Sequence, residues 1–208
     1  MSSLLTASQV QNIIAARILA FPTDTVAGIF ARIDDTDSIE KIFAIKGRAL
    51  QKTLMVMLPN LSCISRYFDL TNDEWKIIKE NSPGQISFLL PLKAGVEISP
   101  NLYQLDQGKA VAGFRIPNHP VAQAILEITG PLAQTSLNVS GTPPICDDED
   151  IPFANQIDFI YPFKKHLSLP STMVRFDNGE MTIIRQGAAQ VKIPSTLSSH
   201  YLLKSLQV

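Results

Sequence analysis

Segments with the apolar spacing of helices alternate with short, strand-like apolar segments along most of this 208-residue chain. Residues 6–17 begin with the capping-box pattern from Thr6 to Gln9, and residues 119–129 have a proline at a tolerated early helix position. Hairpin-like strands crowd together only near the C-terminus. The pattern therefore predicts an α/β protein with a mixed sheet rather than a pure βαβ repeat.

The other expected elements follow from the same two patterns. We expect helices at 37–46, with Gly47 as the stop, and at 61–68 and 71–80. In the tail from residue 193, a short helix carrying Tyr201, Leu202 and Leu203 stays open as an alternative, and ordinary packing against the domain is favoured. We expect strands at the apolar segments 18–21, 53–59, 86–92, 110–117, 131–138, 159–162, 171–176 and 181–187. No Pro-, Gly- or Ser-rich linker divides the chain, which predicts one domain over residues 1–190 and a short C-terminal tail over 191–208.

The composition is that of a globular protein, with 45% hydrophobic and 18% charged residues. The 18 basic and 19 acidic residues give a net charge of -1, which argues against a polybasic nucleic-acid binder. Cys63 and Cys146 are too few for a disulfide framework and have no metal-binding spacing, which favours a reducing cytoplasm. No apolar run approaches the roughly 20 residues that cross a bilayer, so we expect no membrane association.

Three pairs of polar residues, each two positions apart, directly follow apolar segments: Thr23 and Thr25, Lys46 and Arg48, and Ser136 and Asn138. Residues two apart on an extended backbone point to the same side. Ligands of open α/β sheets bind beyond the carboxyl ends of the strands. We therefore treat the three pairs as candidates for one shared site.

Each pair also has a purely structural explanation. Pro-Thr-Asp-Thr at 22–25 is good turn chemistry, and cations at 46–48 suit a helix C-terminus. Only if the helix ends near Gly47 do Lys46 and Arg48 converge on phosphates, with arginine as a planar fork and lysine as a point charge. The donor-rich segment 136–141 suits an anion cradle as well as a plain loop.

Other functional motifs are missing from the sequence. It contains no Walker loop, no G-x-G-x-x-G and no G-x-S-x-G, which removes most support for a P-loop NTPase, a dinucleotide-binding enzyme or a Ser-His-Asp hydrolase. His119, His166 and His200 have no partners at metal-ligand spacing. The acidic run 147–150 is typical of a solvated loop or a helix start, so we expect no metal site.

Six motifs occur in an order that resembles one family. They are FPTDTV at 21–26, KGR at 46–48, SPG at 82–84, FRIPNHP at 114–120, TSLNVSG at 135–141, and STMV at 171–174 with IRQG at 184–187. Over about residues 10–190 the chain is similar to the YrdC/Sua5 family of threonylcarbamoyl-AMP synthases, in its single-domain YrdC form. The resemblance implies an open twisted mixed sheet flanked by helices, with a concave electropositive cleft.

The resemblance also implies a reaction. ATP, L-threonine and bicarbonate would give threonylcarbamoyl-AMP and pyrophosphate for N6-threonylcarbamoyladenosine at position 37 of tRNA (t6A37). Mg²⁺ would be held mainly through the ATP phosphates. The family further implies a downstream threonylcarbamoyl transferase complex as a partner, and tRNA or double-stranded RNA as a possible ligand.

By the same resemblance, Lys46 and Arg48 are the expected catalytic pair on the nucleotide phosphates. The expected ATP-binding residues are Lys46, Arg48, Lys52, Ser136, Asn138 and Arg185. The expected threonine-binding residues are Thr23, Thr25, Arg115 and Ser171. Arg115 would grip the threonine carboxylate as a bidentate clamp.

Four residues depart from the family pattern. Where tyrosine, proline, histidine and alanine are usual, the chain has Ala27, Ala49, Met57 and Leu137, respectively. We expect these departures to affect the threonine side of the site most. Two other functions stay open: a noncatalytic protein that binds nucleotide, tRNA or double-stranded RNA, and a carbamoyltransferase accessory unit. Salt-sensitive binding without any need for ATP would distinguish the RNA-binding alternative.

Overall fold

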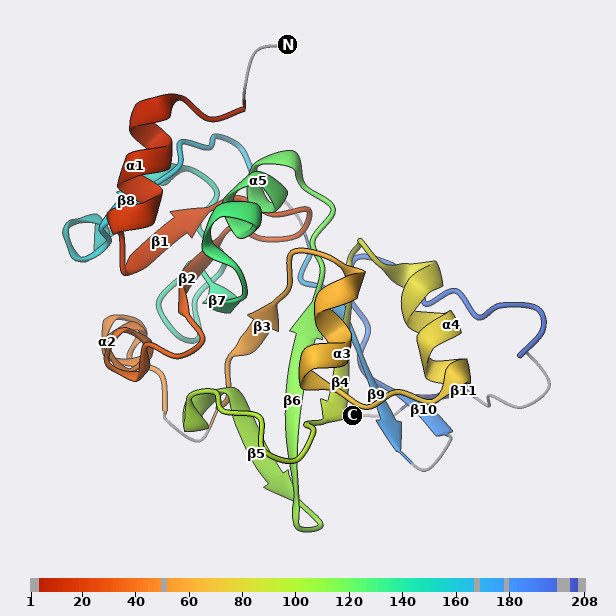
Figure 1. Ribbon diagram of the computed structural model, residues 1–208. Coiled ribbons are helices and arrows are strands. Elements are labelled where there is room, and N and C mark those ends of the chain that lie inside the picture. The colour runs from red at the N-terminus through yellow and green to blue at the C-terminus, as the bar shows by residue number, and fades with distance from the viewer. Residues whose placement is uncertain (1–3, 50–51, 167–168, 178–179, 198–202, 206–208) are drawn as a thin grey trace.

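The computed structural model describes residues 4–49, 52–166, 169–177, 180–197 and 203–205. These residues form five α-helices and one mixed sheet of eleven strands (Figure 1). The helices are α1 (Ala7–Ala15), α2 (Thr36–Lys46), α3 (Ile64–Tyr67), α4 (Asn72–Asn81) and α5 (Pro120–Thr129). The strands are β1 (Ile18–Phe21), β2 (Gly28–Arg32), β3 (Met55–Met57), β4 (Ile86–Pro91), β5 (Tyr103–Asp106), β6 (Lys109–Arg115), β7 (Leu132–Ser136), β8 (Phe159–Ile160), β9 (Thr172–Asp177), β10 (Glu180–Arg185) and β11 (Leu203–Ser205).

The strands run in the order β11-β10-β9-β4-β6-β3-β7-β2-β1-β8, and β5 pairs with β6 off this path. The pairs β1–β8, β3–β6, β4–β9 and β10–β11 are parallel, whereas the other neighbours are antiparallel. The predicted mixed α/β sheet is therefore confirmed. Within the described ranges, none of the helices has the length and apolarity of a membrane span.

A side-chain cap sets the start of α2, and a glycine sets its end. Asp35 caps the helix by accepting a hydrogen bond from the Ser38 N–H at 3.1 Å, so α2 begins at Thr36 and not at Asp37 as expected. The helix ends at the predicted place, because Gly47 has a φ of 58°, a left-handed conformation that few other residues adopt readily.

Three strands have no counterpart among the expected ones: β2, β5 and β11. β5 is short and largely exposed, and β2 begins with glycine, a residue that is uncommon in strands. The alternative of a short helix in the tail is wrong at Leu203, which lies in β11 and pairs in parallel with the edge of β10. The edge strand of a sheet has unpaired backbone N–H and C=O groups, and a segment that lies beside it can pair with them as a further strand. Tyr201 and Leu202 lie outside the described residues.

Helices cover the two faces of the sheet unequally. Alternate residues of a strand point to opposite faces, and on one face Phe88, Phe114 and Val174 pack in a core with α2, α3 and α4. On the other face, α1 and α5 lie together over only part of the sheet (Figure 1). The strand residues beneath them, which we call the covered part of this face, are Leu19, Phe21, Phe30, Met57 and Leu132.

The rest of this second face lines a cavity instead of packing against a helix. Its strand residues, which we call the open part, are Met55, Ser87, Leu89, Gln134 and Met173. The boundary between the two parts crosses single strands. Met57 pairs with Leu132 in the covered part, whereas Met55, two residues earlier, pairs with Gln134 in the open part.

Candidate active site

The open part is the floor of a cavity of about 370 Å³. Three of the lining residues are arginines, Arg48, Arg115 and Arg185, and none of the described lining residues is Asp or Glu. Such a lining favours an anionic ligand, because guanidinium groups form charge-assisted hydrogen bonds with carboxylates and phosphates.

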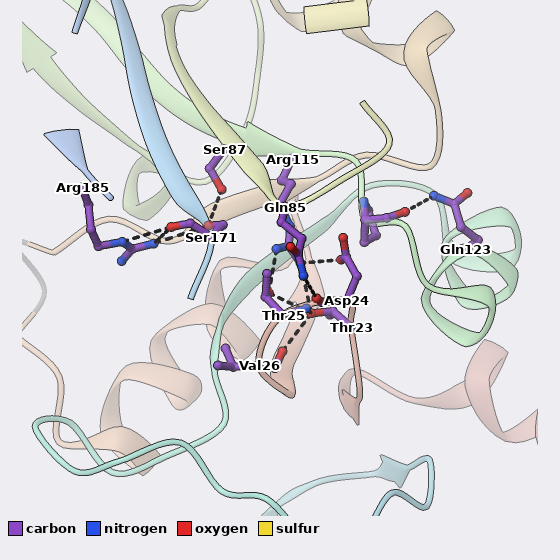
Figure 2. Close-up of polar contacts among 11 residues, drawn as sticks. Thr23, Asp24, Thr25, Val26, Gln85, Ser87, Arg115, Gln123, Ser171 and Arg185 are labelled. Carbon is purple, nitrogen blue, oxygen red and sulfur yellow. Dashed lines mark hydrogen bonds and ion pairs between the residues drawn. The ribbon is translucent and has the colours of Figure 1, made fainter. Parts of the chain in front are cut away.

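Arg115, the last residue of β6, lines the cavity and is held by the loop that follows β1 (Figure 2). Its Nη1 donates to Thr25 Oγ1 at 2.6 Å, and its Nη2 donates to Thr23 Oγ1 at 3.0 Å. The side chain is only 3% exposed. Two hydroxyl groups therefore fix the plane of the guanidinium before any ligand arrives.

One carboxylate balances the charge of Arg115. Asp24 Oδ1 lies 3.3 Å from Arg115 Nη2, and within the described part of the chain neither oxygen of this buried carboxylate accepts a hydrogen bond. Burial lowers the pKa of Arg115, while Asp24 raises this pKa and Arg185 lowers it further. Arginine stays protonated in proteins despite such shifts, so the Arg115 guanidinium is a buried cation.

The two threonines of this loop differ in what they offer a ligand. Thr23 Oγ1 donates to the Val26 carbonyl at 2.8 Å and accepts from the Thr25 N–H at 3.1 Å, so its hydrogen is already used. The Thr25 hydroxyl accepts from Arg115 and lines the cavity. Its hydrogen is free to point toward Thr23 Oγ1, at 3.1 Å, or toward a ligand.

Ser171 and Arg185 meet at the start of β9 and the end of β10. Arg185 Nη2 donates to the Ser171 carbonyl at 2.8 Å, and the Ser171 hydroxyl lies 2.7 Å from the Ser87 hydroxyl (Figure 2). Gly187 allows this approach, since a Cβ there would lie 2.5 Å from the Ser171 carbonyl carbon. The close packing of these two segments accounts for the glycine that ends the IRQG motif.

Arg48 reaches the cavity from the turn after α2. Its Nη2 donates to the Thr53 carbonyl at 3.0 Å and its Nε to the Lys52 carbonyl at 3.2 Å. The guanidinium carbon lies 6.0 Å from the centre of the Phe43 ring. Burial lowers the pKa of Arg48, which remains a cation on the wall of the cavity.

The structure brings six of the ten expected site residues to this cavity: Thr25, Arg48, Arg115, Ser136, Ser171 and Arg185. The other four do not line it. Thr23 accepts a hydrogen bond from Arg115, Lys46 and Asn138 are buried against each other, and Lys52 is exposed. The three polar pairs therefore contribute to one region of the fold, although one member of each pair is set back from the cavity.

Several polar residues of the site have no place among the expected ones: Asp24, Ser87, Gln104 and Gln134. Ser87 is the polar member of the otherwise apolar strand segment at 86–92, and this exception is a usable signal. Gln134 stands two residues before Ser136 and therefore on the same side of β7. Asp24 lies between the two threonines, and its pairing with Arg115 depends on a contact across 91 residues that no local pattern contains.

Neither the acidic run nor any of the four family departures belongs to the described lining of the cavity. Asp148 accepts from the Phe163 N–H at 3.0 Å and Asp147 from the Lys165 N–H at 2.8 Å, so these carboxylates tie down a loop. Among the described residues no group of three His, Cys, Asp or Glu residues could hold a metal ion. The departures Ala27, Met57 and Leu137 are buried in the core, and Ala49 does not line the cavity either.

Comparisons with known proteins all point to one family. A family model named for Sua5, YciO and YrdC, and described as telomere recombination, matches residues 11–187. YciO of Escherichia coli is 28% identical over 179 residues, covering 84% of this chain and 85% of YciO. A threonylcarbamoyl-AMP synthase of Bacillus subtilis is 33% identical over 128 residues, covering 61% of this chain and 36% of the synthase.

The solved structures agree with this family. The crystal structure of E. coli YciO has a TM-score of 0.77 at 27% identity, covering 89% of this chain and 90% of YciO. Sua5 of P. abyssi, crystallised with L-threonine, has a TM-score of 0.73 at 23% identity and shares the fold. The match covers 86% of this chain, which spans about half of the Sua5 chain (52%). On the match over residues 11–187, the chain belongs to the Sua5/YciO/YrdC family.

Proposed function

We propose that the protein is an L-threonylcarbamoyladenylate synthase, which forms threonylcarbamoyl-AMP and pyrophosphate from ATP, L-threonine and bicarbonate. The observation that carries the proposal is the cavity, with three guanidinium groups and no carboxylate in its described lining. Relatives named as threonylcarbamoyl-AMP synthases and the Sua5 complex with L-threonine support it.

Threonine would bind at the Arg115 end of the cavity. The Arg115 guanidinium has five N–H donors, of which two are used by the hydroxyls of Thr23 and Thr25. The remaining donors suit the threonine carboxylate, and Thr25 and Ser171 add hydroxyl groups beside it. The Asp24 carboxylate is buried behind Arg115, so it balances the cation without occupying the space of the ligand.

The nucleotide phosphates would bind along Arg48, Ser136 and Arg185. The threonine amine first adds to the carbon of bicarbonate, and loss of water leaves a carbamate. A carbamate oxygen then attacks the α-phosphorus of ATP, the bond to the β-phosphate oxygen breaks, and pyrophosphate leaves. The protein's part in such a phosphoryl transfer is to position anions and spread their charge. Mg²⁺ enters as part of the MgATP substrate, held mainly by the phosphates, because the described lining offers no carboxylate ligand.

The product is an unstable mixed anhydride, so a second enzyme must consume it promptly. We place this step in the cytoplasm, where a downstream threonylcarbamoyl transferase complex would pass the threonylcarbamoyl group to tRNA in t6A37 modification. The net charge of -1 gives no support to a broad RNA-binding surface on this chain itself.

Pyrophosphate release from MgATP tests the proposal. We expect release only when L-threonine and bicarbonate are both present, with the adenylate identified by its mass. Arg115→Lys keeps the charge but loses the planar fork, and should lower kcat/KM for threonine by about 100-fold or more. Arg66→Lys is the matched control, because Arg66 lies over the Tyr67 ring on α3 and does not line the cavity. Release that ignores threonine, or an Arg115→Lys variant with unchanged kinetics, would contradict the proposal.

A further inference from the structure

Lys46, the last residue of α2, is a charged side chain with only 1% exposure. Its Nζ donates to the Ser136 carbonyl, to the Asn138 carbonyl at 2.6 Å and to Asn138 Oδ1 at 2.8 Å. An ammonium group has three N–H donors, and all three are used here. While these contacts hold, Lys46 has no donor left for a ligand.

The contact between α2 and the segment from Ser136 to Thr142, which we call the β7 loop, runs in both directions. The Ser140 N–H donates to the Lys46 carbonyl at 2.8 Å. Within the loop, Ser136 Oγ donates to Asn138 Oδ1 at 2.7 Å, and Asn138 Nδ2 donates to the Thr142 carbonyl at 2.6 Å. Lys46 thus joins the end of a helix to a loop that is about 90 residues later in the chain.

The left-handed turn at Gly47 sends the two neighbouring cations to different places. Arg48 lines the cavity, whereas Lys46 enters the β7 loop. Ser136, the first residue of the loop, does line the cavity. The position of Ser136 therefore depends on how the loop is held against α2.

We propose that Lys46 is a positioning residue, which holds the β7 loop so that Ser136 faces the cavity, and that Arg48 instead of Lys46 contacts the nucleotide phosphates. The second half of this inference rests on the proposed function, because it names phosphates as the ligand. The first half concerns the free protein. Burial, followed by the nearby Arg48, lowers the pKa of Lys46 to about 8, so the ammonium form still prevails at neutral pH.

Hydrogen exchange in the protein without substrates tests the first half. In Lys46→Met, which keeps the length of the side chain but removes its donors, peptides covering 136–142 should exchange about tenfold faster or more. Lys41→Met is the matched control on the same helix, because Lys41 is exposed, and it should leave this exchange unchanged. Peptides from β4 report whether the rest of the sheet is intact. If Lys46→Met does not fold, Asn138→Ala removes one of the three acceptors of Lys46 together with the hydrogen bonds of this side chain to Ser136 and Thr142, and it should also speed the exchange of the loop.

Unchanged exchange of the β7 loop in Lys46→Met, or in Asn138→Ala where that variant is used, would overturn the positioning role. The second half is tested by NMR titration of the Lys46 Cε resonance, assigned by its loss in Lys46→Met, with and without a nonhydrolysable ATP analogue. We expect the pKa of Lys46 to move by less than about half a unit, whereas a lysine that binds phosphate would rise by about one unit or more. If the analogue does not bind at all, the proposed function and the phosphate contact fail together, but the exchange result still decides the role of Lys46 in the free protein.

Discussion

The covered and open parts of one sheet face show how this fold divides stability from ligand binding. In the covered part, Phe21 and Phe30 stack with ring centres 3.7 Å apart, and Met57 is 1% exposed beneath α5. In the open part, Met55 and Gln134 are only partly buried and line a cavity. Because β3 and β7 supply residues to both parts, a fully packed region supports side chains that are left free to contact a ligand.

Arg115 is the strictest test of this division between stability and ligand binding, because it lines the cavity and yet is as buried as the residues of the covered part. Arg115→Met leaves the Asp24 carboxylate buried without its partner and should lower the free energy of unfolding by about 3–5 kcal/mol. Adding Asp24→Asn removes the orphaned charge and should restore much of that loss. Urea denaturation of the single and double variants measures both values. A single variant as stable as the wild type would show that the ion pair carries no structural role.

Met57 and Met55 allow the same substitution in each part. Met57→Ala opens a space in a packed core and should lower the free energy of unfolding by about 2–5 kcal/mol. Met55→Ala removes a partly exposed side chain and should change this free energy by less than about 1 kcal/mol. It should instead alter the affinity for nucleotide, since Met55 lines the cavity. Equal losses of stability in the two variants would remove the distinction between the parts.

An ion pair outside both parts should have the smallest effect. Arg17 Nη2 lies 2.6 Å from Asp35 Oδ1 and joins the start of β1 to the cap of α2. The Arg17 hydrogen bond holds the pKa of Asp35 well below the ordinary 3.8, so the pair stabilises the fold above that pH and loses this contribution as the pH falls.

Arg17→Ala should therefore shift the urea midpoint at pH 7 by less than Met57→Ala does, and the difference from wild type should shrink in acid. Threonine-dependent turnover should stay at the wild-type value, because Arg17 does not line the cavity. A difference that grows as the pH falls would have the opposite sign and would contradict the assignment.

Local signals predict the helices better than the strands. The capping boxes that begin at Thr6 and Thr71 are both present, and α5 ends at Thr129, the last residue of the expected helix. β2 is missed because its residues lack a clean alternation, and it pairs with β7, which lies far along the chain. β5 is missed for no such reason, because its residues alternate and it forms a hairpin with the neighbouring β6 through Gln107 and Gly108. Helix ends are thus predictable from a few neighbouring residues, whereas a strand such as β2 depends on a distant partner.

The same distinction applies to the candidate site. The motif order predicts Thr25, Arg115 and Ser171 as neighbours, and the structure places all three at one cavity. The burial of Lys46 could not be predicted, because the three acceptors that hold it lie on a loop about 90 residues away. Spacing along the chain identifies candidate residues, but long-range packing decides which of them face the ligand.

A structure of the protein with L-threonine and an α,β-methylene analogue of ATP tests the central claim most directly. We expect both ligands over the open part, with the threonine carboxylate on Arg115 and the phosphates beside Arg48. A second cavity, of about 490 Å³ and lined by Arg32, Arg66 and Glu97, provides an internal comparison. Ligands bound there, or an empty open part at saturating concentrations of both ligands, would contradict the account.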